Sequence, residues 1–144
     1  MKIKMKKALC VLFAIILVCA GLSACGKSPY YAKITYSDGS SEMLDTKDMK
    51  ELYRLYRENE YAYDEKYSRN KIEVVDRIES ISAQGRSGAE ISTDYWTFFL
   101  DDDNPIIVDL REETLVKFYG ELAEVTNGNH PLVFVDTIVI IEEK

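Results

Sequence analysis

Apolar and polar positions divide the chain into segments with different periods. An unbroken apolar run extends from Ala8 to Ala20. Alternating positions at 31–45 flank the turn Ser37-Asp38-Gly39-Ser40, which predicts an N-terminal β-hairpin. At 46–70 the apolar residues recur at steps of three and four, which predicts one amphipathic helix. Beyond residue 70 the period shortens to two, so 71–144 is expected to form a β domain.

Five strands are expected in this β domain, separated by turns and by a Gly- and Ser-rich loop at 83–93. They are Lys71–Ser82, Tyr95–Leu100, Ile106–Leu110, Leu115–Val125 and Leu132–Ile141. The first strand changes its apolar face in the middle, which predicts a bend near Val75–Asp76. The fourth contains Gly120, and bends and interior glycines allow a sheet to curl. We therefore predict a mainly β fold, a five-stranded barrel preceded by the helix and the hairpin.

A helix at about 112–125 is the alternative, and it would make the fold α+β. Val116, Phe118, Gly120 and Leu122 alternate along this segment, as strand residues do. A glycine in a helix interior also costs about 1 kcal/mol. The strand is the favoured interpretation.

The aromatic residues of the helix and the second strand are expected to be mostly packing residues. Tyrosines at helical spacing usually bury their rings and leave their hydroxyls in water. In the second strand, Trp96 and Phe98 share one face and are expected in the core. Tyr95 and Phe99 lie on the other face, and one of them is expected to be exposed.

The N-terminus has the form of an export signal. Lys2, Lys4, Lys6 and Lys7 precede the apolar run, whose 13 residues are too few to span a membrane as a helix. Then follows Leu22-Ser23-Ala24-Cys25, which resembles the lipobox of bacterial lipoproteins. The resemblance implies that the signal peptidase recognises Leu22, Ser23 and Ala24, that lipid is attached to Cys25, and that cleavage precedes it.

This interpretation predicts residues 1–24 as a signal peptide and 25–30 as a lipidated tether. The protein would be exported and anchored to the outer face of the bacterial cytoplasmic membrane, or to the outer membrane in a bacterium with two membranes. Cys10 and Cys19 would leave with the signal peptide, so the mature domain would contain no disulfide. More than one acyl chain on Cys25 would make the membrane anchoring stable.

The charge changes with this cleavage. The whole chain carries a formal net charge of −7, but all four N-terminal lysines would be removed. The remaining 120 residues carry 14 basic and 25 acidic residues, a balance of −11. A basic nucleic-acid binder is therefore disfavoured, because affinity for nucleic acid normally comes from cations that neutralise phosphates.

The stretch Glu51–Ile81 resembles the OB-fold family named for its similarity to the tRNA anticodon-binding domain, many of whose bacterial members are small exported lipoproteins. The similarity rests on residues of the helix and of the strand entry: Leu52, Tyr56, Asn59, Glu60, Asp64, Lys66, Tyr67, Lys71, Ile72 and Val74. Phe118–Leu122 and Phe134–Ile140 are similar to the closing strands. The resemblance implies an OB barrel over 71–144. Asp76 stands where the family usually has a glycine, and the hairpin has no counterpart in it.

OB folds usually bind ligands on strands two and three and the adjoining loops. The candidate ligand face therefore contains Tyr95, Phe99, Arg86 and Arg111. Five aspartates also lie in this region: Asp94, Asp101, Asp102, Asp103 and Asp109. They would repel a phosphate backbone, so no nucleic-acid partner is expected.

Metal binding and catalysis find little support in the residue pattern. Asp101–Asn104 offers oxygen ligands of the kind that calcium prefers, but consecutive residues of a tight turn rarely converge on one ion. His130 is the only histidine, and no cysteine other than Cys25 would remain after cleavage. We expect no enzyme, no metal and no cofactor.

Two functional hypotheses remain open. The first is a membrane-anchored, non-catalytic binding module whose partner is an envelope protein, a peptide or a glycan. The second is an acidic envelope structural or stress-related protein without a discrete ligand site. Fold similarity does not decide between them.

Overall fold

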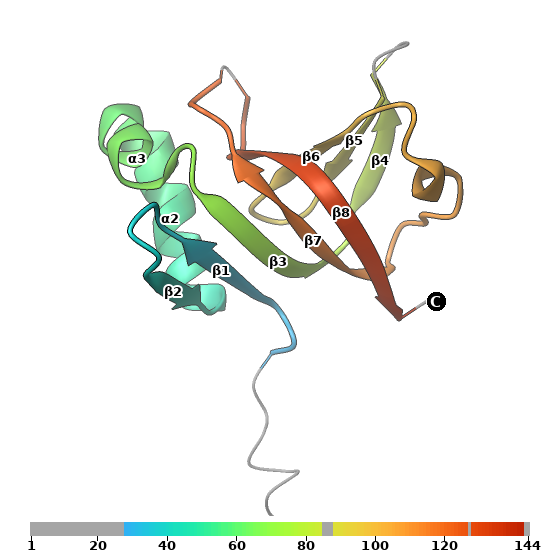
Figure 1. Ribbon diagram of the computed structural model, residues 1–144, viewed down its shortest axis with the longest axis horizontal. Coiled ribbons are helices and arrows are strands. Elements are labelled where there is room, and N and C mark those ends of the chain that lie inside the picture. Colours follow the sequence, from blue (N-terminus) through green and yellow to red (C-terminus); the bar gives the residue numbers. More distant parts are fainter. Residues whose placement is uncertain (1–27, 85–87, 127, 143–144) are drawn as a thin grey trace, which may run out of the picture.

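The computed structural model describes residues 28–84, 88–126 and 128–142, and it is mainly β (Figure 1). Within these ranges, eight strands form one sheet in the order β2-β1-β3-β7-β8-β6-β5-β4. The strands are β1 (Tyr31–Thr35), β2 (Ser41–Leu44), β3 (Lys71–Arg77), β4 (Ser80–Ala83), β5 (Ala89–Ser92), β6 (Thr97–Leu100), β7 (Leu115–Leu122) and β8 (Leu132–Glu142). Two α-helices lie at the β1–β2 end of the sheet, and a 3-10 helix lies at the opposite end.

The N-terminal hairpin is part of the main sheet. β1 and β2 pair antiparallel around a turn in which Gly39 has a φ of 85°, a value that favours glycine. β1 then pairs with β3, with Ala32 opposite Val74 and Ile34 opposite Ile72. All four of these side chains are buried, so the hairpin extends the core along the sheet.

The single helix expected over 46–70 is wrong, because the chain forms two helices, α2 (Thr46–Glu58) and α3 (Glu60–Tyr67). Asn59 separates them with φ −150° and ψ 79°, which is not a helical conformation. Its side-chain oxygen accepts a hydrogen bond from the N–H of Ala62 at 3.1 Å and so caps α3. Asp45 and Asp48 form a capping box at the start of α2.

Most of the helix tyrosines pack against the core, as expected. Tyr56, Tyr63 and Tyr67 are buried, whereas Tyr61 is 79% exposed. Their hydroxyls are not uniformly in water, which corrects the expectation. The Tyr63 hydroxyl is buried without a hydrogen-bond partner among the described residues, and burial raises its pKa above the ordinary value.

The first long strand is interrupted two residues later than predicted. β3 continues through Val75–Asp76 and ends at Arg77, and β4 begins at Ser80. The intervening Ile78 is buried and forms backbone hydrogen bonds with Thr114 and Glu113 on the approach to β7. β3 pairs with β1 and β7, whereas β4 pairs only with β5 at the far end of the strand order.

Three other segments differ from the expectation. The loop at 83–93 contains β5, and β6 begins at Thr97 rather than at Tyr95. The strand expected at Ile106–Leu110 is instead the 3-10 helix η1 (Pro105–Val108). Asn104 caps η1 and Pro105 starts it, an arrangement that suits proline because its missing N–H needs no partner there. The helix alternative at 112–125 is wrong, because β7 occupies this segment.

The core combines buried side chains of the curved sheet, which pack on one another, with those of the two helices at the β1–β2 end. Phe98 of β6 stacks on Phe118 of β7 at 3.8 Å between ring centroids, and both are fully buried. Trp96 is also fully buried, and its Nε1 donates to Sδ of Met49 at 3.4 Å, which ties α2 to the sheet. The prediction that Trp96 and Phe98 are core residues is confirmed.

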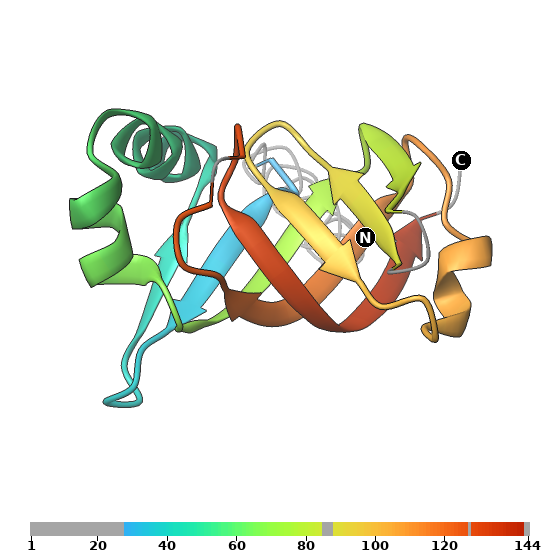
Figure 2. The same ribbon diagram turned by 90° about the horizontal axis from the view of Figure 1, so that it is seen from above.

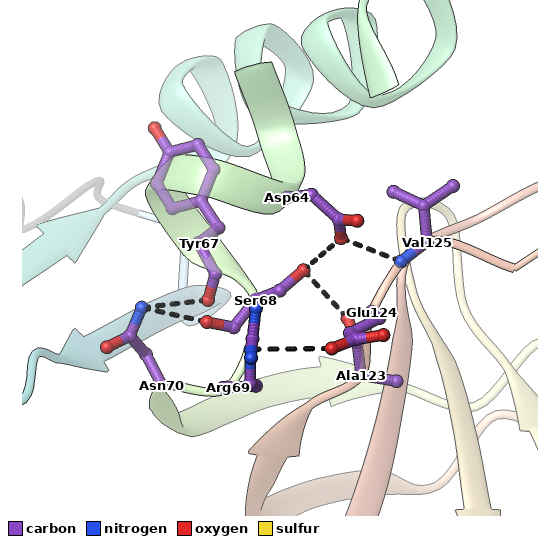
Figure 3. Close-up of polar contacts among 8 residues, drawn as sticks. All are labelled: Asp64, Tyr67, Ser68, Arg69, Asn70, Ala123, Glu124 and Val125. Carbon is purple, nitrogen blue, oxygen red and sulfur yellow. Dashed lines mark hydrogen bonds and ion pairs between the residues drawn. The ribbon is translucent and has the colours of Figure 1, made fainter. Parts of the chain in front are cut away.

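A polar junction joins the end of α3 to the end of β7 (Figure 3). Oδ1 of Asp64 accepts hydrogen bonds from Oγ of Ser68 at 2.5 Å and from the N–H of Val125 at 2.8 Å. Ser68 also contacts the carbonyl of Ala123 at 3.1 Å, and the N–H of Arg69 donates to the carbonyl of Leu122. These contacts fix where the chain leaves β7 and enters the loop before β8.

Candidate functional site

The outer face of β6 and β8 carries aromatic side chains that the core does not cover. The two strands pair in parallel over three positions, with Thr97 opposite Leu132 and Phe99 opposite Phe134. Neighbouring residues of each strand, such as Phe98 and Val133, are buried, so alternation turns these four outward. The rings of Phe99 and Phe134 meet edge to face at 6.3 Å, and Phe134 is 51% exposed.

A second aromatic group continues this face towards α2. The ring of Tyr53 stacks on that of His130 at 5.3 Å and lies 6.2 Å from that of Tyr95. Tyr53 comes from α2, Tyr95 from the turn before β6, and His130 from the loop before β8. All three are half-buried, so the packing fixes each ring while part of it stays in contact with solvent.

We call this surface the aromatic strip. Its residues are Tyr53, Tyr95, Thr97, Phe99, His130, Leu132 and Phe134. Ring faces and edges of this kind bind apolar groups, and the faces of tyrosine and phenylalanine also attract cations. The strip is therefore suited to a ligand that combines apolar surface with a positive charge or with sugar C–H groups.

Carboxylates flank the two phenylalanines on neighbouring strands. Glu90 of β5 lies opposite Phe99, and Glu121 of β7 lies opposite Phe134. Glu90 accepts a hydrogen bond from Nε2 of Gln84 at 2.8 Å, and Glu121 lies 3.2 Å from Nζ of Lys71. The strip is thus flanked by a carboxylate on the β5 side and by a carboxylate paired with a lysine on the β7 side.

The loop that carries His130 is tied to α2. The hydroxyl of Tyr56 donates to the carbonyl of Thr126 at 3.0 Å and lies 3.2 Å from that of Gly128. Tyr56 lies close to Tyr53 in sequence, on the same helix. These contacts hold the β7–β8 loop against α2, where His130 can stack on Tyr53.

The outer face of β1, β3 and β7 has a different character. The hydroxyl of Tyr31 donates to Oε1 of Glu73 at 2.5 Å, and Nζ of Lys117 lies 3.5 Å from the same oxygen. Burial, followed by the hydrogen bond to Glu73, raises the pKa of Tyr31. The charged groups of this face satisfy one another, which leaves fewer of them for a ligand.

The structure brings only some of the predicted ligand-face residues together. Tyr95 and Phe99 lie on the aromatic strip, in its two groups. Arg111 does not join them, because its Nη1 donates to the carbonyls of Val108 at 2.8 Å and Leu110 at 2.7 Å and closes the loop after η1. Arg86 lies outside the described residues, as do Leu22, Ser23, Ala24 and Cys25.

Sequence reasoning did not identify Tyr53, His130 or Phe134 as members of a site. Phe134 and His130 reach it through the parallel pairing of β6 with β8, which joins segments about 35 residues apart. Tyr53 lies four residues after Met49 in the apolar stripe of α2, so its spacing predicts packing, but the structure leaves it only half-buried. No signal in the sequence distinguishes it from the buried residues of the stripe.

The acidic turn at Asp101–Asn104 serves η1. The side chain of Asn104 accepts from the N–H of Ile106 at 3.2 Å, and its own N–H donates to the carbonyl of Asp101. Over residues 28–84, 88–126 and 128–142, no group of three or more His, Cys, Asp or Glu is placed to hold a metal ion. None of the helices in these ranges has the length and apolar character needed to cross a membrane.

Comparisons with family models, with curated proteins and with solved structures found no match to this chain. The functional argument therefore rests on the geometry of the site.

Proposed function

We propose that the protein is a lipid-anchored extracytoplasmic binding module of OB type, and that the aromatic strip is its ligand surface. The observation that carries this proposal is the gathering of five aromatic or imidazole rings from α2, β6, β8 and two loops on one outer face. These rings come from segments far apart in sequence, and the core leaves each of them partly exposed. Partly exposed aromatics that are held in place are typical of recognition surfaces.

The strand order supports an OB-type barrel. If β3 and β4 are taken as two halves of one bent strand, the order runs from β3 through β7, β8, β6 and β5 back to β4. This leaves five strands besides the hairpin, as an OB barrel has. The aromatic strip would then include the third strand, which belongs to the usual OB ligand face.

The ligand classes that fit best are a polypeptide segment and a glycan. The rings supply apolar contacts, and Glu90 and Glu121 supply hydrogen-bond acceptors beside Phe99 and Phe134. The same carboxylates disfavour nucleic acid, because its phosphates would meet negative charge. A non-catalytic role agrees with a site whose described residues offer rings and isolated carboxylates.

The proposed lipid anchor would keep the module at the membrane surface. Five residues separate Cys25 from Tyr31, the first residue of β1. Even fully extended, this tether spans only about 20 Å. Partners would therefore be other components of the envelope.

Photo-cross-linking in living cells tests the ligand surface. A photoreactive residue at Thr97 is combined with Phe99→Ala/Phe134→Ala, and Val108→Ala, 73% exposed on η1, is the matched control. We expect a discrete cross-linked partner in the parent and in the control, and its loss in the double variant. If the double variant keeps both the cross-link and the cellular phenotype, while neutralisation of scattered surface acids removes the phenotype, the acidic structural role replaces this proposal.

The anchor is tested separately. Cys25→Ser should leave an unprocessed precursor that incorporates no labelled palmitate, whereas Cys19→Ser should be processed normally. Lipid labelling of the Cys25→Ser protein would show that the N-terminal interpretation is wrong.

A further inference from the structure

β8 is much longer than its pairing with β6. It pairs with β7 from Val133 to Glu142, but with β6 only from Leu132 to Phe134. Figure 2 shows β8 running on past the end of β6. Among the described residues, no backbone hydrogen bond or ladder occupies the β6 side of β8 from Val135 to Glu142. We call this segment the open edge.

The open edge has the properties of a strand that can accept another. An unpaired strand edge presents N–H and C=O groups at alternate residues, which can template a further strand. Most of its residues are exposed, including two large apolar side chains, Val139 at 48% and Ile141 at 49%. Ile138, the residue before Val139, is buried, so the inner face of the strand remains attached to the core. Extended peptides bind such edges through main-chain hydrogen bonds, with side-chain contacts adding specificity.

We propose that the open edge of β8 binds an extended polypeptide segment in which basic and apolar residues alternate. This surface is distinct from the aromatic strip, because the strip uses side chains of the outer face and the open edge uses backbone groups. The proposal therefore goes beyond the function proposed above.

The charges around the open edge select a basic partner. Asp136 and Glu142 are its only charged residues, and both are exposed. Nζ of Lys71 lies 3.7 Å from Asp136, a contact between two exposed groups that contributes little, and Nη2 of the half-buried Arg77 lies 3.6 Å from Glu142. Three more aspartates, Asp101 to Asp103, follow directly after β6. A basic segment would meet complementary charge at both ends of the edge.

A second copy of the chain fits this edge poorly. Antiparallel self-pairing centred on Val139 would place Asp136 opposite Glu142, and like charges directly opposite one another destabilise a strand pair. The 25 acidic residues against 18 basic ones in the chain add a general repulsion between copies. The occupant is thus a partner of opposite charge.

Synthetic peptides as long as the open edge provide the test, with the detergent-solubilised full-length protein as the receptor. The probe alternates lysine with valine. One matched control is N-methylated on the edge that would face β8, and a second replaces every lysine with glutamate. Amide NMR titration and hydrogen exchange report the site. We expect the probe to slow exchange of amides within 135–142, and both controls to bind about tenfold more weakly or worse.

Two receptor variants complete the design. Asp136→Asn/Glu142→Gln should weaken the probe, whereas Phe99→Ala/Phe134→Ala should leave its binding at 135–142 unchanged. Equal binding of the N-methylated peptide would overturn strand addition, and equal binding of the glutamate peptide would overturn the charge selection. Loss of probe binding in the phenylalanine variant, with shifts on the strip, would place the peptide on the aromatic strip instead. Absence of any binding would refute the proposal while leaving the strip untouched.

Discussion

The backbone N–H of Val125 donates to Oδ1 of Asp64 at 2.8 Å, across 61 residues of sequence. The same oxygen accepts from Oγ of Ser68, so one carboxylate holds the last turn of α3 and the exit of β7 (Figure 3). The β7–β8 loop begins at this point and carries His130 near its end. The geometry of the aromatic strip therefore depends on a contact outside it.

Asp64→Ala should destabilise the domain by about 1–3 kcal/mol, because the N–H of Val125 loses its acceptor and the buried hydroxyl of Ser68 keeps only the carbonyl of Ala123. Urea unfolding followed by circular dichroism measures the change. Glu65→Ala is the matched control, since Glu65 is the next residue of α3 and is exposed. Its effect should stay within about 0.5 kcal/mol. Equal stabilities of the two variants would mean that the junction contributes nothing.

Asp76→Asn should make stability less dependent on pH. Asp76 is only 6% exposed, its Oδ2 has no hydrogen-bond partner among the described residues, and burial raises its pKa to about 6. The folded state therefore keeps this proton up to about pH 6, whereas the unfolded state releases it near pH 4. The free energy of unfolding falls as the pH rises above about 4, and the loss is nearly complete once the pH passes about 6. At pH 7.5 the penalty is about 3 kcal/mol.

The variant should therefore exceed the parent in stability at pH 7.5 and approach it at pH 4, as measured by urea unfolding at both values. Asp109→Asn, at an exposed position, is the matched control. A constant offset between Asp76→Asn and the parent at both pH values would contradict the raised pKa.

Gly120→Ala should separate β7 from β8. A Cβ at Gly120 would lie 2.1 Å from the carbonyl oxygen of Phe134 and 2.9 Å from its carbon, so the backbone itself would have to move. We expect a loss of about 1–3 kcal/mol or more in thermal unfolding. At Gly128 the nearest atom is the side-chain Oγ1 of Thr126 at 3.3 Å, so Gly128→Ala should be tolerated much better. The opposite ranking would show that the strands can adjust at Gly120.

Local patterns predicted the hairpin, the β7 strand and the buried positions of β6, because each depends on neighbours in sequence. The errors arose where one residue changes the local geometry. Asn59 ends α2 and caps α3 within a continuous apolar stripe, and Asn104-Pro105 starts a 3-10 helix in a segment rich in isoleucine and valine. Asparagine before a first helical residue is a recognisable signal in both cases.

The candidate site was predictable only in part. Tyr95 and Phe99 were identified because alternation places them opposite Trp96 and Phe98. Phe134 joins Phe99 through a parallel strand pair, and such pairing depends on the whole topology rather than on local sequence. Arg111 was assigned to the ligand face by its position after a presumed strand, but η1 occupies that place, and the carbonyls of Val108 and Leu110 bind the guanidinium.

Tyr56→Phe should loosen the loop that carries His130 while leaving the fold intact. The buried ring stays in place, but the carbonyls of Thr126 and Gly128 lose the hydroxyl that contacts them at 3.0 and 3.2 Å. We expect a loss of about 1 kcal/mol in the free energy of unfolding. Hydrogen exchange of the amides from Gly128 to His130 should become faster, and cross-linking through the aromatic strip should weaken.

Tyr61→Phe is the matched control for this change. Tyr61 lies on α3, is 79% exposed, and its hydroxyl forms no hydrogen bond with the described residues. It should leave both stability and loop exchange at parent values. Weaker cross-linking at the strip in Tyr56→Phe, without faster exchange in the loop, would show that the hydroxyl does not act by holding this loop in place. If neither quantity changes, the placement of His130 against Tyr53 depends on ring packing alone, at 5.3 Å between centroids.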